Sequence, residues 1–213
     1  MNIEIIKKSV KNITLRIYPD GRIRLTAPKR AGDEYIKYFI EKKRPWIEKK
    51  LKEINERKPK EVLYNTGEKI YFLGKEYNFI LEESKNNCIE KNDSSIILYT
   101  SFPNNYEAKH KIVNAWYREK SKEIFVPILE KYLGFTGKSI EKLTIKTLKR
   151  NWGSCNYRKR HINLNSEMLK KDIRFIEYVI LHEVAHLEHP DHSKSFYNYV
   201  AQYMPDWKER KNL

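Results

Sequence analysis

Apolar and polar residues alternate along the first part of the chain, as they do in strands with one buried face. This alternation predicts strands over residues 3–18 and 22–27, joined at the turn Pro19-Asp20-Gly21. Proline sets the entry to such a turn and glycine accepts a positive φ, so we expect a hairpin. From about 33 to 57, apolar residues recur at helical spacing, which predicts one helix, or two with a break near Pro45.

Two further strands are expected at residues 69–82 and 95–100. The polar segment between them, residues 83–93, is expected to be a loop. Trp46, on the preceding helix, is interpreted as a core residue. These elements predict a first portion of mixed strands and helices, covering residues 1–104.

The second portion is predicted to span residues 105–213 and to begin with a long helix from 106 to about 133, which Gly134 ends. Strands are expected at 143–148 and 161–165, on either side of a turn. The fold class is therefore predicted to be α+β. A chain of 213 residues is long enough for the two portions to form one compact unit.

The pentapeptide at residues 182–186, His-Glu-Val-Ala-His, is the strongest chemical signal in the sequence. Helical residues four apart lie on one face, so His182 and His186 can ligate one ion through neutral imidazole nitrogens. Glu183 is rotated by about 100° from His182 and can act as a general base on a metal-bound water. Apolar residues at helical spacing surround the motif, and Asp172 is expected to cap the helix. The pattern predicts a zinc site.

A catalytic zinc ion usually has three protein ligands and one open position for water. Pro190 cannot continue the helix, so we expect the chain to turn there and fold back over the metal. His192 is the preferred third ligand and His189 the second choice, with Glu188 and Asp191 as further candidates. An exposed histidine favoured by the helix dipole is the alternative interpretation of His189.

Separated motifs along the chain extend this signal. In the second half they read Trp152-Gly153-Ser154-Cys155, Ile162-Asn163-Leu164-Asn165, Tyr178-Val179-Ile180-Leu181-His182-Glu183, His192-Ser193 with Phe196, and Pro205-Asp206. In the first half they read Pro19-Asp20-Gly21, Ala27-Pro28, Trp46-Ile47, Gly67, and Phe72-Leu73-Gly74-Lys75 with Tyr77. In this order the motifs resemble the YgjP-like metallopeptidase domain family over nearly the whole chain. One departure is Asn151, where the family suggests a basic residue before the tryptophan.

The resemblance implies a zincin-like catalytic core with a mixed, partly antiparallel sheet and an HExxH helix, preceded by a small N-terminal portion. It implies one Zn²⁺ per chain, held by His182, His186 and His192, with Glu183 as the base. By analogy with zinc peptidases, an exposed sheet edge near the metal would hold an extended peptide substrate. The candidates for the oxyanion stabiliser are Tyr197, Tyr199, His189 and Arg150, each of which also has a structural interpretation.

The net charge of +15 bears on the partners of the protein. Residues 29–60 contain 12 basic and 6 acidic side chains, and residues 138–160 contain 8 and 1. A basic surface beside a metal site would attract an anionic substrate, a nucleotide or a nucleic acid. A general enrichment in lysine explains the same counts without such a partner.

Two cysteines, Cys88 and Cys155, are too few for a disulfide framework and fit a reducing compartment. Cys155 is interpreted as a small buried residue in preference to a nucleophile. The sequence has no run of 18 apolar residues and no signal pattern at its start, so we expect a cytoplasmic protein with no membrane partner.

Three classes of function are consistent with these features. The first is a zinc-dependent hydrolase that cleaves peptide bonds, a metallopeptidase. The second is a metal-dependent phosphohydrolase acting on nucleotides, because an activated water can also attack phosphorus. The third is a nucleic-acid-associated protein with structural zinc, which the presence of Glu183 disfavours, because a structural site needs no base.

Overall fold

The computed structural model describes residues 2–18, 20–57 and 62–213. Its contacts divide the chain into two compact units, Met1–Glu61 and Val62–Leu213. The sequence predicted a division after residue 104. The difference has a physical reason: the strands that follow residue 62 share one hydrophobic core with the helices of the second half.

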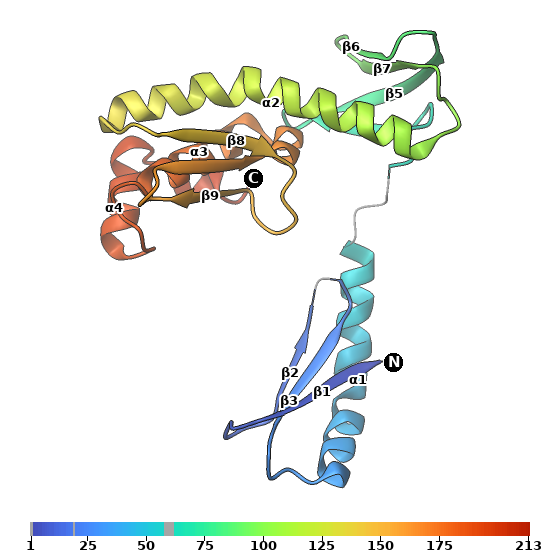
Figure 1. The fold of residues 1–213 in the computed structure, drawn as a ribbon, viewed down its shortest axis with the longest axis vertical. Coiled ribbons are helices and arrows are strands. Elements are labelled where there is room, and N and C mark those ends of the chain that lie inside the picture. Colours follow the sequence, from blue (N-terminus) through green and yellow to red (C-terminus); the bar gives the residue numbers. More distant parts are fainter. Residues whose placement is uncertain (1, 19, 58–61) are drawn as a thin grey trace. The chain divides into compact units, whose positions relative to one another are not determined.

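The first unit contains a three-stranded sheet in the order β1-β3-β2 (Figure 1). Its strands are β1 (Ile3–Lys8), β2 (Thr14–Ile17) and β3 (Ile23–Pro28). The predicted hairpin is confirmed by the antiparallel pair β2 and β3, whereas β1 pairs with β3 in parallel. The first predicted strand is therefore two strands, on opposite sides of β3. Pro19 in the predicted turn lies outside the described residues.

Helix α1 (Asp33–Arg57) is a single helix that contains Pro45. Ile36 of α1 packs with the fully buried Leu25 and Ala27 of the central strand β3. The interpretation of Trp46 as a core residue was wrong, since 44% of this side chain is exposed. The neighbouring Ile47 is fully buried instead, and successive helical residues differ by about 100° in direction.

The second unit begins with a four-stranded sheet in the order β4-β5-β7-β6. Strands β4 (Lys69–Phe72) and β5 (Lys75–Glu83) form a hairpin that turns at Gly74, which has a φ of 77°. Strand β7 (Ser95–Thr100) pairs in parallel with β5. Strand β6 (Cys88–Lys91) pairs with β7 inside the segment that was predicted to be a loop.

Helix α2 (Tyr106–Thr136) extends from this sheet to the second sheet of the unit (Figure 1). Asn105 caps its start by accepting a hydrogen bond from the Ala108 amide at 3.0 Å. Gly134 was predicted to end the helix, but α2 continues past it and ends at Gly137. Gly137 has the left-handed φ of 64° that a C-terminal cap of this kind uses, and there glycine has no steric penalty.

The second sheet has the order β8-β10-β9. Strands β8 (Lys142–Lys146) and β10 (His161–Asn165) are parallel and match the predicted positions closely. Strand β9 (Gly153–Asn156) was predicted only as part of a turn, and it pairs antiparallel with β10. The short helix η1 (Ser166–Lys170) and then α3 (Ile173–Ala185) follow β10.

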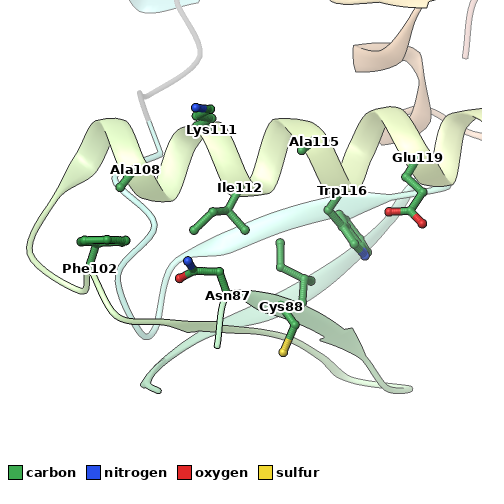
Figure 2. A pocket seen from close by; sticks show the side chains of 10 residues that line it. Asn87, Cys88, Phe102, Ala108, Lys111, Ile112, Ala115, Trp116 and Glu119 are labelled. Atoms are coloured by element: carbon green, nitrogen blue, oxygen red, sulfur yellow. The ribbon is translucent and has the colours of Figure 1, made fainter. Parts of the chain in front are cut away.

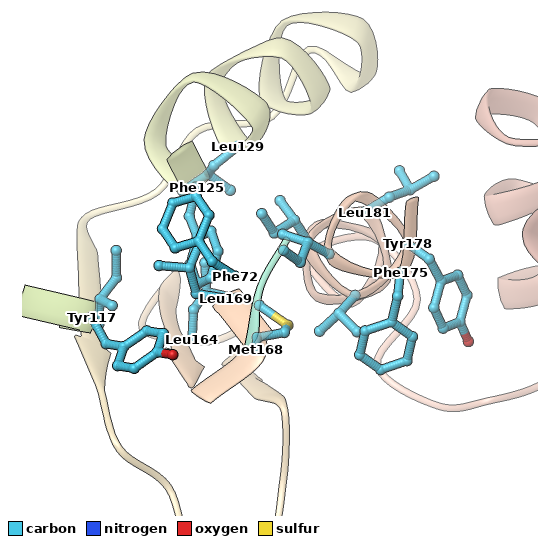
Figure 3. Packing of buried hydrophobic residues seen from close by; sticks show 14 of the residues in the cluster. Phe72, Tyr117, Phe125, Leu129, Leu164, Met168, Leu169, Phe175, Tyr178 and Leu181 are labelled. Atoms are coloured by element: carbon cyan, nitrogen blue, oxygen red, sulfur yellow. The ribbon is translucent and has the colours of Figure 1, made fainter. Parts of the chain in front are cut away.

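Buried side chains of α2, η1 and α3 form the centre of the second unit (Figure 3). Phe125 of α2, Met168 of η1 and Leu181 of α3 are all fully buried. Helices α4 (Lys194–Tyr203) and α5 (Trp207–Arg210) complete the unit. The predicted α+β class is therefore confirmed.

Among the helices of the described residues, none is long and apolar enough to cross a membrane. The cytoplasmic location stays a prediction.

The N-terminal cap of α3 can be tested directly. The Asp172 carboxylate accepts a hydrogen bond from the Arg174 amide at 2.7 Å, as the sequence predicted. Asp172→Ala removes this acceptor and should lower the free energy of unfolding in urea by about 1 kcal/mol. Asp172→Asn keeps an acceptor and should retain most of the stability. Equal losses in the two variants would show that the cap is not the cause.

Candidate metal centre and active site

Helix α3 positions the first two histidines of the site. The helix ends at Ala185, but His186 keeps helical angles (φ −65°, ψ −16°), and its amide donates to the His182 carbonyl at 3.3 Å. His182 and His186 therefore lie on the same face of the helix, as their spacing of four residues predicted. The two imidazoles lie together, with ring centroids 4.8 Å apart.

The segment after α3 brings a third imidazole to the same point. The chain leaves helical structure before Pro190, as predicted, and His192 follows in the irregular segment that leads to α4. Nε2 of His192 lies 3.0 Å from Nε2 of His182. The ligand atoms of His182, His186 and His192 all lie within 4.8 Å of one another, so these three side chains could hold one metal ion.

Hydrogen bonds at the Nδ1 atoms help to orient the rings of His182 and His186. Nδ1 of His186 lies 3.0 Å from the His189 carbonyl, to which it donates, and this leaves Nε2 of His186 free to bind a metal. Nδ1 of His182 lies 3.4 Å from the Tyr178 hydroxyl, so its Nε2 is the atom that faces His192. His189 thus contributes a backbone carbonyl, and its own ring packs against Tyr199.

A buried phenylalanine supports all three imidazoles. The Phe196 ring centroid lies 4.8 Å from that of His182, 4.6 Å from that of His186 and 5.0 Å from that of His192. Phe196 is fully buried at the start of α4. Sequence reasoning cited Phe196 only within a motif, without a role in the site.

Burial favours the neutral form of two histidines of the cluster, His182 and His186. Burial, together with the neighbouring His186 and His192, lowers the pKa of His182 to about 3. Burial is also the main cause that lowers the pKa of His186. A divalent cation binds the unprotonated ring nitrogen, so the donor set fits a metal such as zinc.

Glu183 occupies the buried side of the site. Only 5% of this residue is exposed, and burial raises its pKa to about 8. The backbone of β9 passes directly beside it: a Cβ atom on Gly153 would lie 2.6 Å from the Glu183 Oε1 atom. Only glycine allows the strand and the carboxylate to approach so closely.

Asn165 fixes the segment that leads into β9. Its side chain accepts from the Leu148 amide at 3.1 Å and donates to the carbonyls of Leu148 and Asn151 at 3.0 and 2.9 Å. Its own amide donates to the Trp152 carbonyl at 2.8 Å. Asn165 is buried, so these bonds satisfy groups that would be costly to leave unpaired. Sequence reasoning cited Asn165 only within a motif, without a role.

A cavity of about 360 Å³ opens beside His182 and Glu183. It is lined by Trp152, Gly153, Phe175, Tyr178, Val179, His182, Glu183 and Lys211. A larger cavity, of about 680 Å³, lies between α2 and β6 and contains none of the predicted site residues (Figure 2). The smaller cavity is therefore the one that can admit a substrate to the histidine cluster.

Three other candidates lie outside this arrangement. Glu188 forms an ion pair with Lys138. Asp191 is exposed and is not part of the histidine cluster. Cys155 is half-buried, and burial raises the pKa of its thiol to about 12, which keeps it protonated and a poor nucleophile.

The oxyanion candidates are dispersed. Tyr197 stacks on Trp207 with ring centroids 4.8 Å apart and lies 6.2 Å from the His192 ring. Arg150 is exposed and makes no hydrogen bond or ion pair with the residues that the structure describes. The cation that does line the cavity is Lys211, which sequence reasoning did not consider because it lies far from the motif along the chain.

Comparisons with known proteins identify the family. The YgjP-like metallopeptidase domain matches residues 11–213. No curated protein matches the chain. Two similar crystal structures are those of metallopeptidase zymogens. Pyrococcus abyssi abylysin has 25% sequence identity, and the match covers 41% of this chain and 89% of that chain with a TM-score of 0.38. Methanocaldococcus jannaschii jannalysin has 23% sequence identity, and the match covers 41% of this chain and 84% of that chain with a TM-score of 0.37. The family match covers nearly the whole sequence, and the chain therefore belongs to the YgjP-like metallopeptidase family.

Proposed function

We propose that the protein hydrolyses peptide bonds with one Zn²⁺ held by His182, His186 and His192, and with Glu183 as general base. The single observation that carries the proposal is the convergence of three imidazoles whose ligand atoms lie within 4.8 Å. Zinc–imidazole bonds in a tetrahedral site place two ligand nitrogens about 3.4 Å apart, close to the 3.0 Å between the facing nitrogens of His182 and His192.

The chain supplies proton transfer as well as metal ligands. When bound, the ion polarises the scissile carbonyl and makes its water a stronger acid. Glu183 directly follows the ligand His182 and shares the cavity with it, so its carboxylate can take a proton from the attacking water. Glu183 then returns the proton to the leaving nitrogen. Its burial excludes bulk water from this exchange.

Strand β9 offers a binding edge for a peptide. It pairs with β10 on one side, and no strand in the described part of the chain pairs with its other side. An extended peptide can add to such an edge through backbone hydrogen bonds. Gly153 begins β9 and lies against Glu183, so a peptide on this edge would pass close to the general base.

Three proteins without an affinity tag test the proposal. The parent should contain about one zinc per chain and cleave denatured casein. His182→Ala should lose both the zinc and the cleavage, because it removes a ligand. Glu183→Gln should keep the zinc and lose nearly all cleavage, because its amide cannot accept the proton. Metal is measured by elemental mass spectrometry and cleavage by peptide release.

Full cleavage by Glu183→Gln would contradict the mechanism. Nucleoside triphosphates form the second arm of the experiment. Release of phosphate or pyrophosphate without any cleavage of casein would favour the phosphohydrolase instead. Absence of metal from the parent, even after addition of zinc, would overturn the proposed site.

The close approach of β9 to Glu183 gives a second prediction. Gly153→Ala places a methyl group where the Glu183 carboxylate now lies, and it should lower casein cleavage by about 100-fold through displacement of that group. Zinc content should not change, because Glu183 is not a ligand. The matched control is Gly134→Ala, whose added Cβ would meet no atom within 4 Å. Equal activities in the two variants would contradict this role of Gly153.

A second candidate function rests on the surface of α1. Tyr35, Tyr38 and Trp46 are 59%, 62% and 44% exposed. At about 100° per residue they share one face of the helix with Lys42 and Lys49, neither of which forms an ion pair with a described residue. Bases stack on exposed aromatic rings while lysines bind the phosphates between them, so we propose that this face binds single-stranded nucleic acid.

Fluorescence anisotropy with labelled oligothymidylate tests this second function. Replacing both Tyr38 and Trp46 by Ala should weaken binding by at least about tenfold, because each base stack contributes about 1–3 kcal/mol. The matched control is Tyr71→Ala, which removes an exposed tyrosine of the second unit. The proposal would be contradicted if the double variant bound the oligonucleotide as tightly as the parent does. It would also be contradicted if the parent bound only vesicles of anionic lipid.

A further inference from the structure

The cavity beside Glu183 combines aromatic walls with one cation. Trp152 and Phe175 meet edge to face with centroids 5.7 Å apart, and Tyr178 lines the same space. Lys211 is the only lysine or arginine among the residues that line the cavity, and Glu183 is the only carboxylic acid. A ligand in this space therefore meets apolar rings and an ammonium group.

The ammonium group of Lys211 has no counter-ion in the described structure. Lys211 is exposed and forms no ion pair with any residue of 2–18, 20–57 or 62–213. Lys211 lines the cavity together with His182 and Glu183, so its ammonium group is available to a ligand that enters there.

A second lysine reinforces the positive potential. The Lys171 ammonium lies 5.9 Å from the centroid of the Trp152 ring and 5.8 Å from that of Phe175. Lys171 also has no ion pair within the described ranges. Two unpaired cations beside one aromatic cavity favour an anionic ligand over a neutral one.

We infer that this cavity is a substrate subsite for a residue bearing a carboxylate, and that Lys211 binds the carboxylate. This inference rests on the proposed peptidase function and names its substrate class. The methylene groups of a glutamate side chain would pack on Trp152 and Phe175 while its carboxylate reaches Lys211. A wholly apolar side chain would displace water from Lys211 without replacing its hydrogen bonds, at a cost in affinity.

A carboxylate in a peptide comes either from an acidic side chain or from the chain terminus. Both present the same chemistry to Lys211, and peptide pairs distinguish them. The first pair is acetyl-Ala-Ala-Glu-Ala-Ala-amide and its Gln analogue. The second pair is acetyl-Ala-Ala-Ala with a free terminal carboxylate and the same peptide with a terminal amide.

The experiment uses zinc-loaded Glu183→Gln protein, in which binding is measured without cleavage. Nuclear magnetic resonance titration follows the indole N–H of Trp152, a wall of the cavity. One peptide of a pair should bind about tenfold more tightly than its neutral analogue, as expected for one charge-assisted hydrogen bond. Lys211→Ala in the same background should remove this difference. Lys208→Ala, which removes an exposed lysine outside the cavity, should preserve it.

Each outcome decides one point. A preference in the first pair assigns the subsite to an acidic side chain, and a preference in the second pair assigns it to a chain terminus. Equal affinities within both pairs, or a preference that survives Lys211→Ala, would overturn the inference. Because binding is read without turnover, casein cleavage by the parent can fail or succeed independently of this result.

Discussion

The close contact between β9 and α3 is the constraint on which the site depends. A Cβ atom at Gly153 would lie 2.6 Å from the Glu183 carboxylate, so the strand can reach the helix only where the chain has glycine. The contact buries Glu183 and brings an open strand edge to the same place. Asn165 holds the preceding loop through its paired amide and carbonyl groups, which keeps the position of β9 fixed. The proposed general base and the proposed peptide-binding edge therefore depend on one contact.

Burial on α3 also prepares the imidazoles for a metal. The helix places His182 beside a hydrophobic core, and Phe196 packs against all three histidine rings. Desolvation disfavours the protonated forms of His182 and His186, so the lone pairs of these two rings stay available near neutral pH. Buried polar groups without partners destabilise a fold. A metal bound at this cluster would satisfy those lone pairs and stabilise the folded state through the same contacts.

Local sequence patterns predicted the parts of the site that depend on one helix and its ends. The helical spacing of His182 and His186, the cap at Asp172 and the turn before Pro190 all follow from chain-local geometry. Gly153, Asn165 and Lys211 could not be assigned in this way, because their roles arise from contacts between distant segments. Short strands had the same difficulty: β6 and β9 have four residues each, too few for a clear alternation. The unit boundary between residues 61 and 62 was likewise not apparent from the sequence, because it depends on which distant segments pack into one core.

In the proposed function, the open edge of β9 and the cavity lined by Trp152 and Lys211 would have different parts in substrate recognition. Backbone hydrogen bonds to a strand edge are the same for almost every residue type, so they would supply affinity and alignment with little selectivity. Side chains alternate in direction along an extended peptide, so the two residues that flank a scissile bond point to opposite faces. Only one of them can then enter the cavity lined by Trp152 and Lys211. Selectivity of this enzyme should therefore be concentrated at one substrate position, with broad tolerance at its neighbours.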